Sequence, residues 1–150
     1  MIKILTVCLG NICRSPAAEG ILRHQLQEAG WEEGVDFELD SAGTGSWHIG
    51  CSSDERSQAV CARYGVDISG QQARQLTVED GTYFDLILGM DYSNLDNIKI
   101  ILAEADHHKV ALFDTIEVND PYYSASDGFE IMYQQLEAAA EVWVKRLLAG

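Results

Sequence analysis

The chain has 150 residues, of which 47% are hydrophobic, enough apolar side chains for one domain over residues 1–150 with a buried core. Asp and Glu number 24 against 10 Lys and Arg, and the resulting net charge of −14 argues against a nucleic acid or a membrane surface as a partner. Because no apolar run approaches transmembrane length and no secretory signal precedes the first strand, we expect a cytoplasmic protein whose 4 cysteines remain thiols.

A candidate anion-binding loop follows the first predicted element. Residues 2–7 form a short apolar, partly β-branched run that predicts a strand, and Ser15 followed by Pro16 is typical of a helix cap and its first turn. Between them, Gly10 and Asn11 tolerate a positive φ, which lets successive backbone N–H groups turn inward. Inward N–H groups in front of a helix N-terminus favour the binding of a tetrahedral anion.

Cys8 and Arg14 lie at the two ends of this loop. The planar guanidinium of Arg14 can hold two phosphate oxygens at once. Among N–H dipoles, a helix N-terminus and a guanidinium, Cys8 is expected to be a thiolate at neutral pH, and the Ser15 hydroxyl could donate a hydrogen bond to it. Singly, these residues also fit a buried cysteine, a surface arginine and a helix cap. The spacing Cys-x5-Arg-Ser-Pro between a strand and a helix favours a catalytic loop.

Downstream, helical and strand patterns alternate. Apolar periodicity predicts strands over residues 37–42, 85–90 and 110–113, a short helical turn from residue 77, and helices over residues 16–29, 53–64, 91–103 and from 127 onward. Ser53 is a predicted cap, and the pairs Thr77 with Asp80 and Asp127 with Glu130 are predicted capping boxes. The alternation predicts an α/β fold, a four-stranded parallel sheet with helices on both faces, in which ligands bind at the carboxyl ends of the strands.

The loop over residues 43–50 has too many glycines for regular structure and carries Trp47. The indole could form an aromatic wall for a flat substrate or pack on the protein as a lid, and the sequence leaves both open. His48 beside it, like His24, fits an ordinary surface histidine.

A second loop, over residues 114–126, lacks periodicity, and loops of this length often carry function. Expulsion of an alkoxide or phenoxide from phosphorus calls for a proton donor, for which Asp120 is the best candidate. Pro121 restrains the Asp120 backbone to extended geometry, and Tyr122 and Tyr123 offer apolar faces to an aromatic leaving group. The alternative is an ordinary Asp-Pro turn followed by two loop tyrosines.

These motifs resemble the low-molecular-weight protein tyrosine phosphatases, whose signature is a Cys-x5-Arg-Ser loop directly after the first strand, with a second cysteine before the arginine, here Cys13. Further matching segments are Ser41-Ala-Gly-Thr44, Ala73-Arg74-Gln75, Met90-Asp91 with Asn94-Leu95, and Asp120-Pro121-Tyr122-Tyr123. The chain departs from the family pattern at Gln71, where a histidine normally braces the phosphate loop, and at Ser53 and Ser124, where a proline and a glycine are usual. Because Gln71 replaces this histidine, the sequence does not show whether the phosphate loop keeps the hydrogen bond that supports it.

The resemblance implies a flavodoxin-like fold of the phosphotyrosine phosphatase I type and hydrolysis of phosphotyrosine in proteins, without a metal or cofactor. In this reaction Cys8 attacks phosphorus while Asp120 protonates the leaving phenol, and water then releases inorganic phosphate from the cysteinyl phosphate. The implied catalytic residues are Cys8, Arg14 and Asp120. The implied phosphate-binding residues are Leu9, Gly10, Asn11, Ile12, Cys13 and Ser15, and those that bind the substrate ring are Trp47, Tyr122 and Tyr123.

Cys13 also predicts redox control. A reactive thiolate at Cys8 is readily oxidised to a sulfenic acid, which a neighbouring thiol can capture as a disulfide. Because both cysteines lie in one tightly wound loop, their α-carbons can come within the roughly 4.4 to 6.8 Å that a disulfide needs. The alternative is that Cys13 only fills space under the loop.

Other functions fit the motifs less well. An arsenate reductase needs a resolving cysteine pair near the loop, whereas Cys51 and Cys61 lie away from the expected site. The apolar Ile12 favours a phenyl ring over the guanidinium of phosphoarginine. A phosphotyrosine-binding module without catalysis would need neither nucleophile nor proton donor. A structural zinc site would have to use widely spaced cysteines and adjacent histidines: Cys8, Cys13, His107 and His108.

Overall fold

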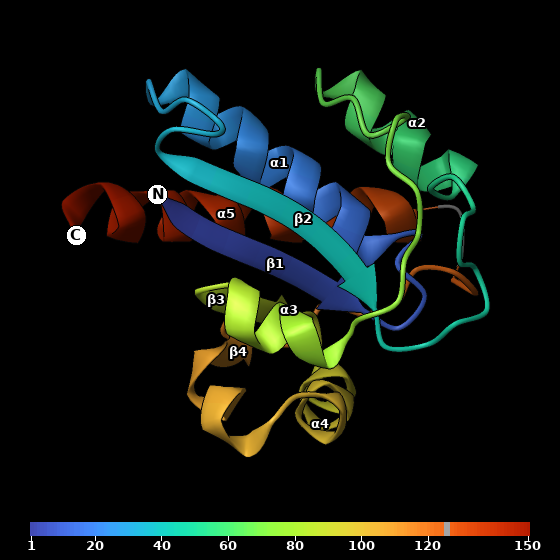
Figure 1. Cartoon of the computed structure of the whole chain (residues 1–150). Coiled ribbons are helices and arrows are strands. Elements are labelled where there is room, and N and C mark those ends of the chain that lie inside the picture. Colours follow the sequence, from blue (N-terminus) through green and yellow to red (C-terminus); the bar gives the residue numbers. More distant parts are fainter. Residues whose placement is uncertain (125–126) are drawn as a thin grey trace.

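The computed structural model describes residues 1–124 and 127–150, and the strands in these residues form one parallel sheet in the order β2-β1-β3-β4 (Figure 1). They are β1 (Ile2–Cys8), β2 (Phe37–Gly43), β3 (Leu86–Gly89) and β4 (Val110–Leu112). The predicted four-stranded parallel fold is therefore confirmed. Cys8 pairs with Gly43, and Val7 pairs with Gly89, so the carboxyl ends of three adjacent strands lie level at one edge. The last two residues of the predicted 114–126 loop lie outside the described residues.

Helices cover both faces of the sheet, as expected. One face carries α1 (Arg14–Glu28), α2 (Glu55–Arg63) and α5 (Gly128–Ala149), and the other carries α3 (Val78–Tyr83) and α4 (Tyr92–Ile101) (Figure 1). A 3-10 helix, η1 (Glu104–Lys109), precedes β4 and was not expected from the sequence. Across residues 1–124 and 127–150, none of the helices combines the length and apolarity that crossing a bilayer requires.

The central strand β1 supplies side chains to both cores. Ile4 belongs to the apolar cluster on the α1 and α5 face, whereas Leu5 and Val7 belong to the cluster on the α3 and α4 face. This alternation follows from the two-residue period of a strand, and it explains why a parallel strand covered on both faces is mostly apolar where it is buried. The three side chains are at most 1% exposed, and burial of each contributes about 1.5–3 kcal/mol. Cys8 therefore stands at the carboxyl end of a strand whose residues 4–8 are buried.

The helix starts differ from the predicted ones at three places. Helix α1 begins at Arg14, so Ser15 lies inside its first turn and is not its cap. Asp54, rather than Ser53, caps α2 by accepting a hydrogen bond from the Arg56 N–H. Glu130 does not complete a box with Asp127 but pairs with Arg63 and Tyr64 of α2. The predicted box between Thr77 and Asp80 is confirmed.

Candidate active site

The sulfur of Cys8 lies at the centre of a loop that joins β1 to α1. The backbone N–H of Asn11 donates to Cys8 Sγ at 3.3 Å, and the hydroxyl oxygen of Ser15 lies 3.1 Å from the same sulfur. Cys8 is only 3% exposed. The Ser15 hydroxyl also donates to the Ala42 carbonyl at 3.4 Å, so its partners lie in the loop and on β2 and not at the helix end.

Asn11 gives this loop its shape. Its φ is 57°, in the left-handed region that asparagine tolerates better than most residues. Its side-chain amide donates to the hydroxyls of Ser15 and Ser41, both at 2.9 Å, and its side-chain oxygen accepts from the Arg74 N–H, also at 2.9 Å. Three hydrogen bonds thus hold one buried side chain in the conformation that turns the loop inward.

Gln71 occupies the place where the family pattern has a histidine. The Ser41 hydroxyl donates to Gln71 Oε1 at 3.3 Å, and Gln71 Nε2 donates to the Pro16 carbonyl at 3.1 Å. Because the Ser41 hydroxyl accepts a hydrogen bond from the Asn11 side chain, Gln71 supports the loop indirectly, through Ser41. The support of the phosphate loop that the sequence left undecided is therefore present, and the side-chain amide of Gln71 provides it.

The guanidinium of Arg14 is 2% exposed, and two partners within the protein hold its Nη1. Its Nη1 donates to Asp91 Oδ2 at 2.6 Å and to the Val118 carbonyl at 2.9 Å. Burial works against the charge, but the nearby Cys8, Asp91 and Asp120 outweigh it and raise the pKa of Arg14 above its usual value. Sequence reasoning gave Asp91 no role, although its position directly after β3, beside β1 at the same edge, was a usable signal.

Asp120 lies across the loop from Cys8, on the segment that follows β4. Its Oδ2 is 3.7 Å from Arg14 Nη2, and its Oδ1 accepts a hydrogen bond from the Tyr122 N–H at 3.0 Å. The Val118 N–H donates to the Met90 carbonyl at 2.8 Å, which fixes the start of this segment on the sheet edge. The loop that carries Cys8 and Arg14 and the segment that carries Asp120 therefore lie side by side, as predicted from the parallel sheet.

A cavity of about 420 Å³ opens above the sulfur, lined by Cys8, Leu9, Gly10, Ile12, Cys13, Arg14, Trp47, His48, Asp120, Tyr122 and Tyr123. Of the residues predicted for the site, Asn11 and Ser15 do not line it, because their buried side chains lie behind the loop. His48, taken from the sequence as a surface histidine, does line the cavity, and its ring centroid is 6.4 Å from that of Tyr122. No sequence pattern marked it.

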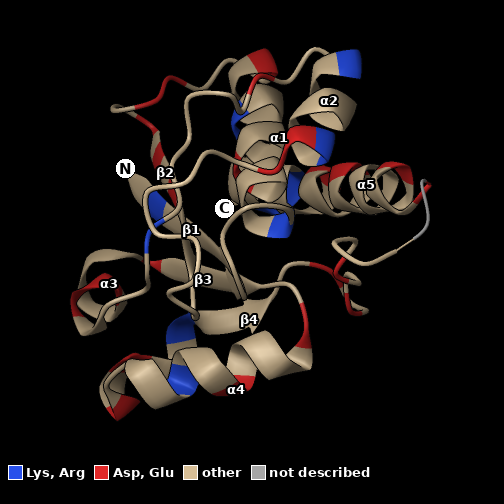
Figure 2. Ribbon diagram, turned by 90° about the vertical axis from the view of Figure 1, so that its right-hand side faces the viewer, with Lys and Arg blue, Asp and Glu red and all other residues tan. Residues whose placement is uncertain are grey.

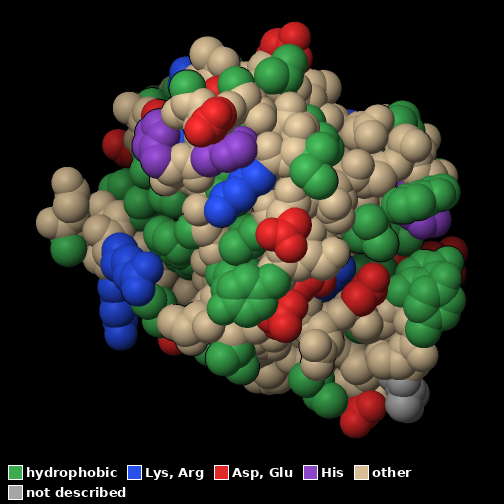
Figure 3. Space-filling model, turned by 90° about the horizontal axis from the view of Figure 1, so that it is seen from below, with side chains coloured by type: hydrophobic (Ala, Val, Ile, Leu, Met, Phe, Trp, Pro, Cys, Tyr) green, Lys and Arg blue, Asp and Glu red, His purple; other side chains and the backbone are tan. Residues whose placement is uncertain are grey.

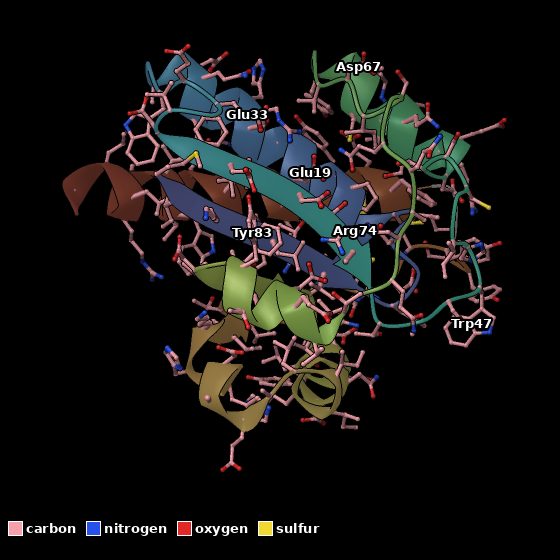
Figure 4. All side chains as sticks on the ribbon, viewed as in Figure 1. Glu19, Glu33, Trp47, Asp67, Arg74 and Tyr83 are labelled. Carbon is pink, nitrogen blue, oxygen red and sulfur yellow. The ribbon has the colours of Figure 1, made fainter. Side chains whose placement is uncertain are left out.

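Aromatic side chains form the outer wall of the cavity. Trp47 is 72% exposed and lies on the loop after β2, pointing away from the sheet (Figure 4). Its ring lies over Gly45, where a β-carbon would overlap it. The rings of Tyr122 and Tyr123, on the Asp120 segment, pack edge to face with their centroids 4.8 Å apart. Trp47 lines the cavity, a position that fits the aromatic wall, one of the two roles that the sequence left open.

Acidic side chains are distributed over the surface of this chain, whose net charge is −14. Asp and Glu are spread over α3, α4, α5 and the connecting loops (Figure 2), and on the face seen from below acidic side chains lie beside hydrophobic ones (Figure 3). Among the residues that line the cavity, Arg14 is the one Lys or Arg. Attraction for an anion is therefore supplied locally, by Arg14 and the loop N–H groups.

Comparisons with known proteins agree with this geometry. The family model described as low molecular weight phosphotyrosine protein phosphatase matches residues 3–149. The chain belongs to this family. A family member from Schizosaccharomyces pombe is 40% identical over 97% of both chains, and a putative one from Synechocystis is 45% identical over 91% of this chain and 90% of its own. The crystal structure of a protein tyrosine phosphatase from Entamoeba histolytica superposes with a TM-score of 0.93 at 34% identity, covering 100% of this chain and 99% of that one.

The chain is accordingly a low molecular weight protein-tyrosine phosphatase, a phosphoric monoester hydrolase. The residues of the alternative sites lie as follows. His107 and His108 contact the carbonyls of Leu102 and Ala105 near η1, and within residues 1–124 and 127–150 no group of three or more His, Cys, Asp or Glu could hold a metal ion. Cys51 is exposed, whereas Cys61 is buried in α2, where burial raises the pKa of its thiol to about 12.

The first prediction concerns Asn11. Asn11→Gly removes the side-chain hydrogen bonds but keeps the left-handed backbone accessible, whereas Asn11→Ala loses both. Urea unfolding should therefore show Asn11→Ala to be less stable than Asn11→Gly by about 1 kcal/mol. Both variants should be inhibited more weakly by inorganic phosphate than the wild type, because the N–H groups are no longer held inward. Wild-type inhibition constants in both would show that these hydrogen bonds do not shape the anion site.

Proposed function

We propose that this phosphatase hydrolyses phosphotyrosine in proteins through a cysteinyl-phosphate intermediate, with Cys8 as nucleophile and Asp120 as proton donor. One observation carries the proposal: Cys8, Arg14 and Asp120 line the same cavity, and Arg14 Nη2 lies 3.7 Å from the Asp120 carboxylate. A nucleophile on one side of phosphorus and an acid on the other are what in-line displacement of a phenol requires.

In the first step the Cys8 thiolate attacks phosphorus. The P–S bond forms as the P–O bond to the phenol breaks, and Asp120 transfers its proton to the departing oxygen. Arg14 and the inward N–H groups of residues 9–13 bind the equatorial phosphoryl oxygens, whose charge is spread in the transition state. Ser15, 3.1 Å from the sulfur, is placed to donate a hydrogen bond that stabilises the thiolate.

In the second step water attacks the phosphocysteine. Asp120, now a carboxylate, accepts a proton from the water as the P–O bond forms and the P–S bond breaks. Inorganic phosphate leaves, and both Cys8 and Asp120 return to their starting states. The 42% exposure of the Asp120 side chain supports this role, because the carboxylate has access to water.

The walls of the cavity favour a flat aromatic leaving group. Ile12 lies on one side of the opening, and Trp47, Tyr122 and Tyr123 supply aromatic faces around it. A phenyl ring gains from such contacts, whereas the charged guanidinium of phosphoarginine would be desolvated beside Ile12. The proposed partners are therefore phosphotyrosine-containing proteins.

We further propose that residues 1–150 act as one catalytic domain in the cytoplasm. The site takes residues from position 8 to position 123, so it needs nearly the whole sheet. All four cysteines are free thiols in the structure, and catalysis by Cys8 requires a compartment that keeps it reduced.

The second prediction tests the nucleophile. Cys8→Ser should abolish turnover yet still bind vanadate or phosphate, because the backbone N–H groups and Arg14 make the anion site. Binding measured by calorimetry, together with activity assays, separates the two properties. Appreciable turnover in this variant would sink the assignment of Cys8.

The third prediction tests the proton donor. Asp120→Asn should slow the phosphorylation step with a phosphotyrosine peptide by roughly 10²- to 10⁴-fold, the usual contribution of general acid catalysis. Aryl phosphates with much better leaving groups should lose less, since their phenolates need no proton. If single-turnover rates fall equally for both kinds of substrate, Asp120 is not the acid.

The fourth prediction concerns a proposed redox role for Cys13. Burial, together with Asp54 and Cys8, raises the pKa of the Cys13 thiol, so peroxide should first convert Cys8 to a sulfenic acid. The Cys13 thiol then attacks this sulfur, which forms the disulfide and releases water. After peroxide followed by dithiothreitol, the wild type should recover activity and Cys13→Ser should not. Equal recovery, with no linked Cys8 and Cys13 peptide in mass spectra, would mean that Cys13 gives no protection.

A further inference from the structure

Arg56, at the start of α2, connects the phosphate loop to the segment that carries Asp120. On the loop side, the N–H of Asp54 donates to the Ile12 carbonyl at 2.8 Å. The Asp54 carboxylate accepts from Arg56 Nε at 3.1 Å and from Nη2 at 2.9 Å, and these hydrogen bonds lower the pKa of Asp54. A carboxylate fixed to the phosphate loop therefore holds the guanidinium by two of its nitrogens.

On its other side, Arg56 holds Tyr122. Its Nη1 donates to the Tyr122 carbonyl at 3.2 Å. The guanidinium carbon also lies 5.3 Å from the centroid of the Tyr122 ring and 4.6 Å from that of Phe129, the second residue of α5. Planar guanidinium groups are suited to stacking and hydrogen bonding at the same time. Arg56 thus contacts both the backbone and the ring of Tyr122.

Tyr122 in turn is bonded to Asp120. Its N–H donates to Asp120 Oδ1 at 3.0 Å, which closes a turn around Pro121. The other end of this segment is held at Val118, whose N–H donates to Met90 and whose carbonyl accepts from Arg14. Asp120 therefore lies between two anchors, Val118 on the sheet edge and Tyr122 on Arg56.

We propose that Arg56 is a positioning residue for Asp120, which it holds at a fixed distance from the phosphate loop through Tyr122. This inference rests on the proposed role of Asp120 as proton donor. General acid catalysis depends on hydrogen-bond reach between the acid and the leaving oxygen, and a displacement of about 1 Å can cost as much as 10²-fold in rate. Two other roles for Arg56 make different predictions: direct binding of substrate by its exposed side, and simple stabilisation of α2 against α5.

The test compares Arg56→Ala and Arg56→Lys with the wild type in single-turnover phosphorylation of phenyl phosphate and of 4-nitrophenyl phosphate. Arg56→Ala should lose about 10-fold with phenyl phosphate, whose leaving oxygen needs the proton, and less than about 3-fold with 4-nitrophenyl phosphate. Arg56→Lys keeps the charge but loses the planar fork, so its losses should fall between those of Arg56→Ala and the wild type. Introduced into Asp120→Asn, Arg56→Ala should cost no more than about 2-fold further, since the acid it positions is gone.

Arg63→Ala is the matched control. Arg63 lies on the same helix and also reaches α5, pairing with Glu130 at 2.8 Å, but it is Arg56 and not Arg63 that binds Tyr122. Its removal should leave both rates at the wild-type value, whereas a general loosening of α2 from α5 would lower them in both variants.

The outcomes separate this inference from the proposed function. If Asp120→Asn is sensitive to the leaving group but Arg56→Ala slows both substrates equally, or adds its full effect to Asp120→Asn, the positioning role alone is overturned. A loss in Arg56→Ala confined to KM would also overturn it, in favour of substrate binding. If Asp120→Asn itself shows no leaving-group dependence, the proton donor and its positioning residue are both wrong.

Discussion

The structure depends above all on the buried charge of Arg14. Removing a guanidinium from water costs several kcal/mol, and this cost is offset only where good hydrogen bonds replace the lost solvent. Asp91 Oδ2 and the Val118 carbonyl supply these bonds at 2.6 and 2.9 Å. Nη2 remains directed toward the cavity and Asp120, so the partners that stabilise the charge also aim its free edge at the anion site.

This arrangement explains why the parallel sheet matters to the chemistry. Cys8 follows β1, Asp91 comes shortly after β3, and Val118 belongs to the segment after β4. Parallel strands place their carboxyl ends at one edge, so residues distant in the sequence meet there without a long excursion of the chain. Antiparallel pairing of β3 with β1 would send Asp91 to the opposite edge and leave the Arg14 charge buried without a carboxylate.

How well the sequence predicts an interaction in the site depends on how many residues separate the two partners. The anion loop was predictable because the contacts among Cys8, Asn11 and Ser15 span only three to seven residues, so the spacing of these residues determines them. The hydrogen bond between Arg14 and Asp91 joins residues 77 positions apart, and the one between Arg56 and Tyr122 joins residues 66 positions apart. Both bonds therefore form only once the strands and α2 are packed. Ser15 shows a different limit, because one hydroxyl suits a helix cap and a sulfur equally, and only the structure decides.

The net negative charge of the chain repels a phosphate dianion more weakly than Arg14 and the loop N–H groups attract it. Exposed carboxylates are screened over about 8 Å at physiological salt, whereas a contact at about 4 Å with an effective dielectric of 20 is worth roughly 4 kcal/mol. Of the two carboxyl groups nearest Arg14, Asp91 is already paired with it. The other, Asp120, lines the cavity, where its Oδ2 lies 3.7 Å from Arg14 Nη2. The edge of the guanidinium that carries Nη2 is therefore the one left to attract the dianion, because Nη1 is held by Asp91 and Val118.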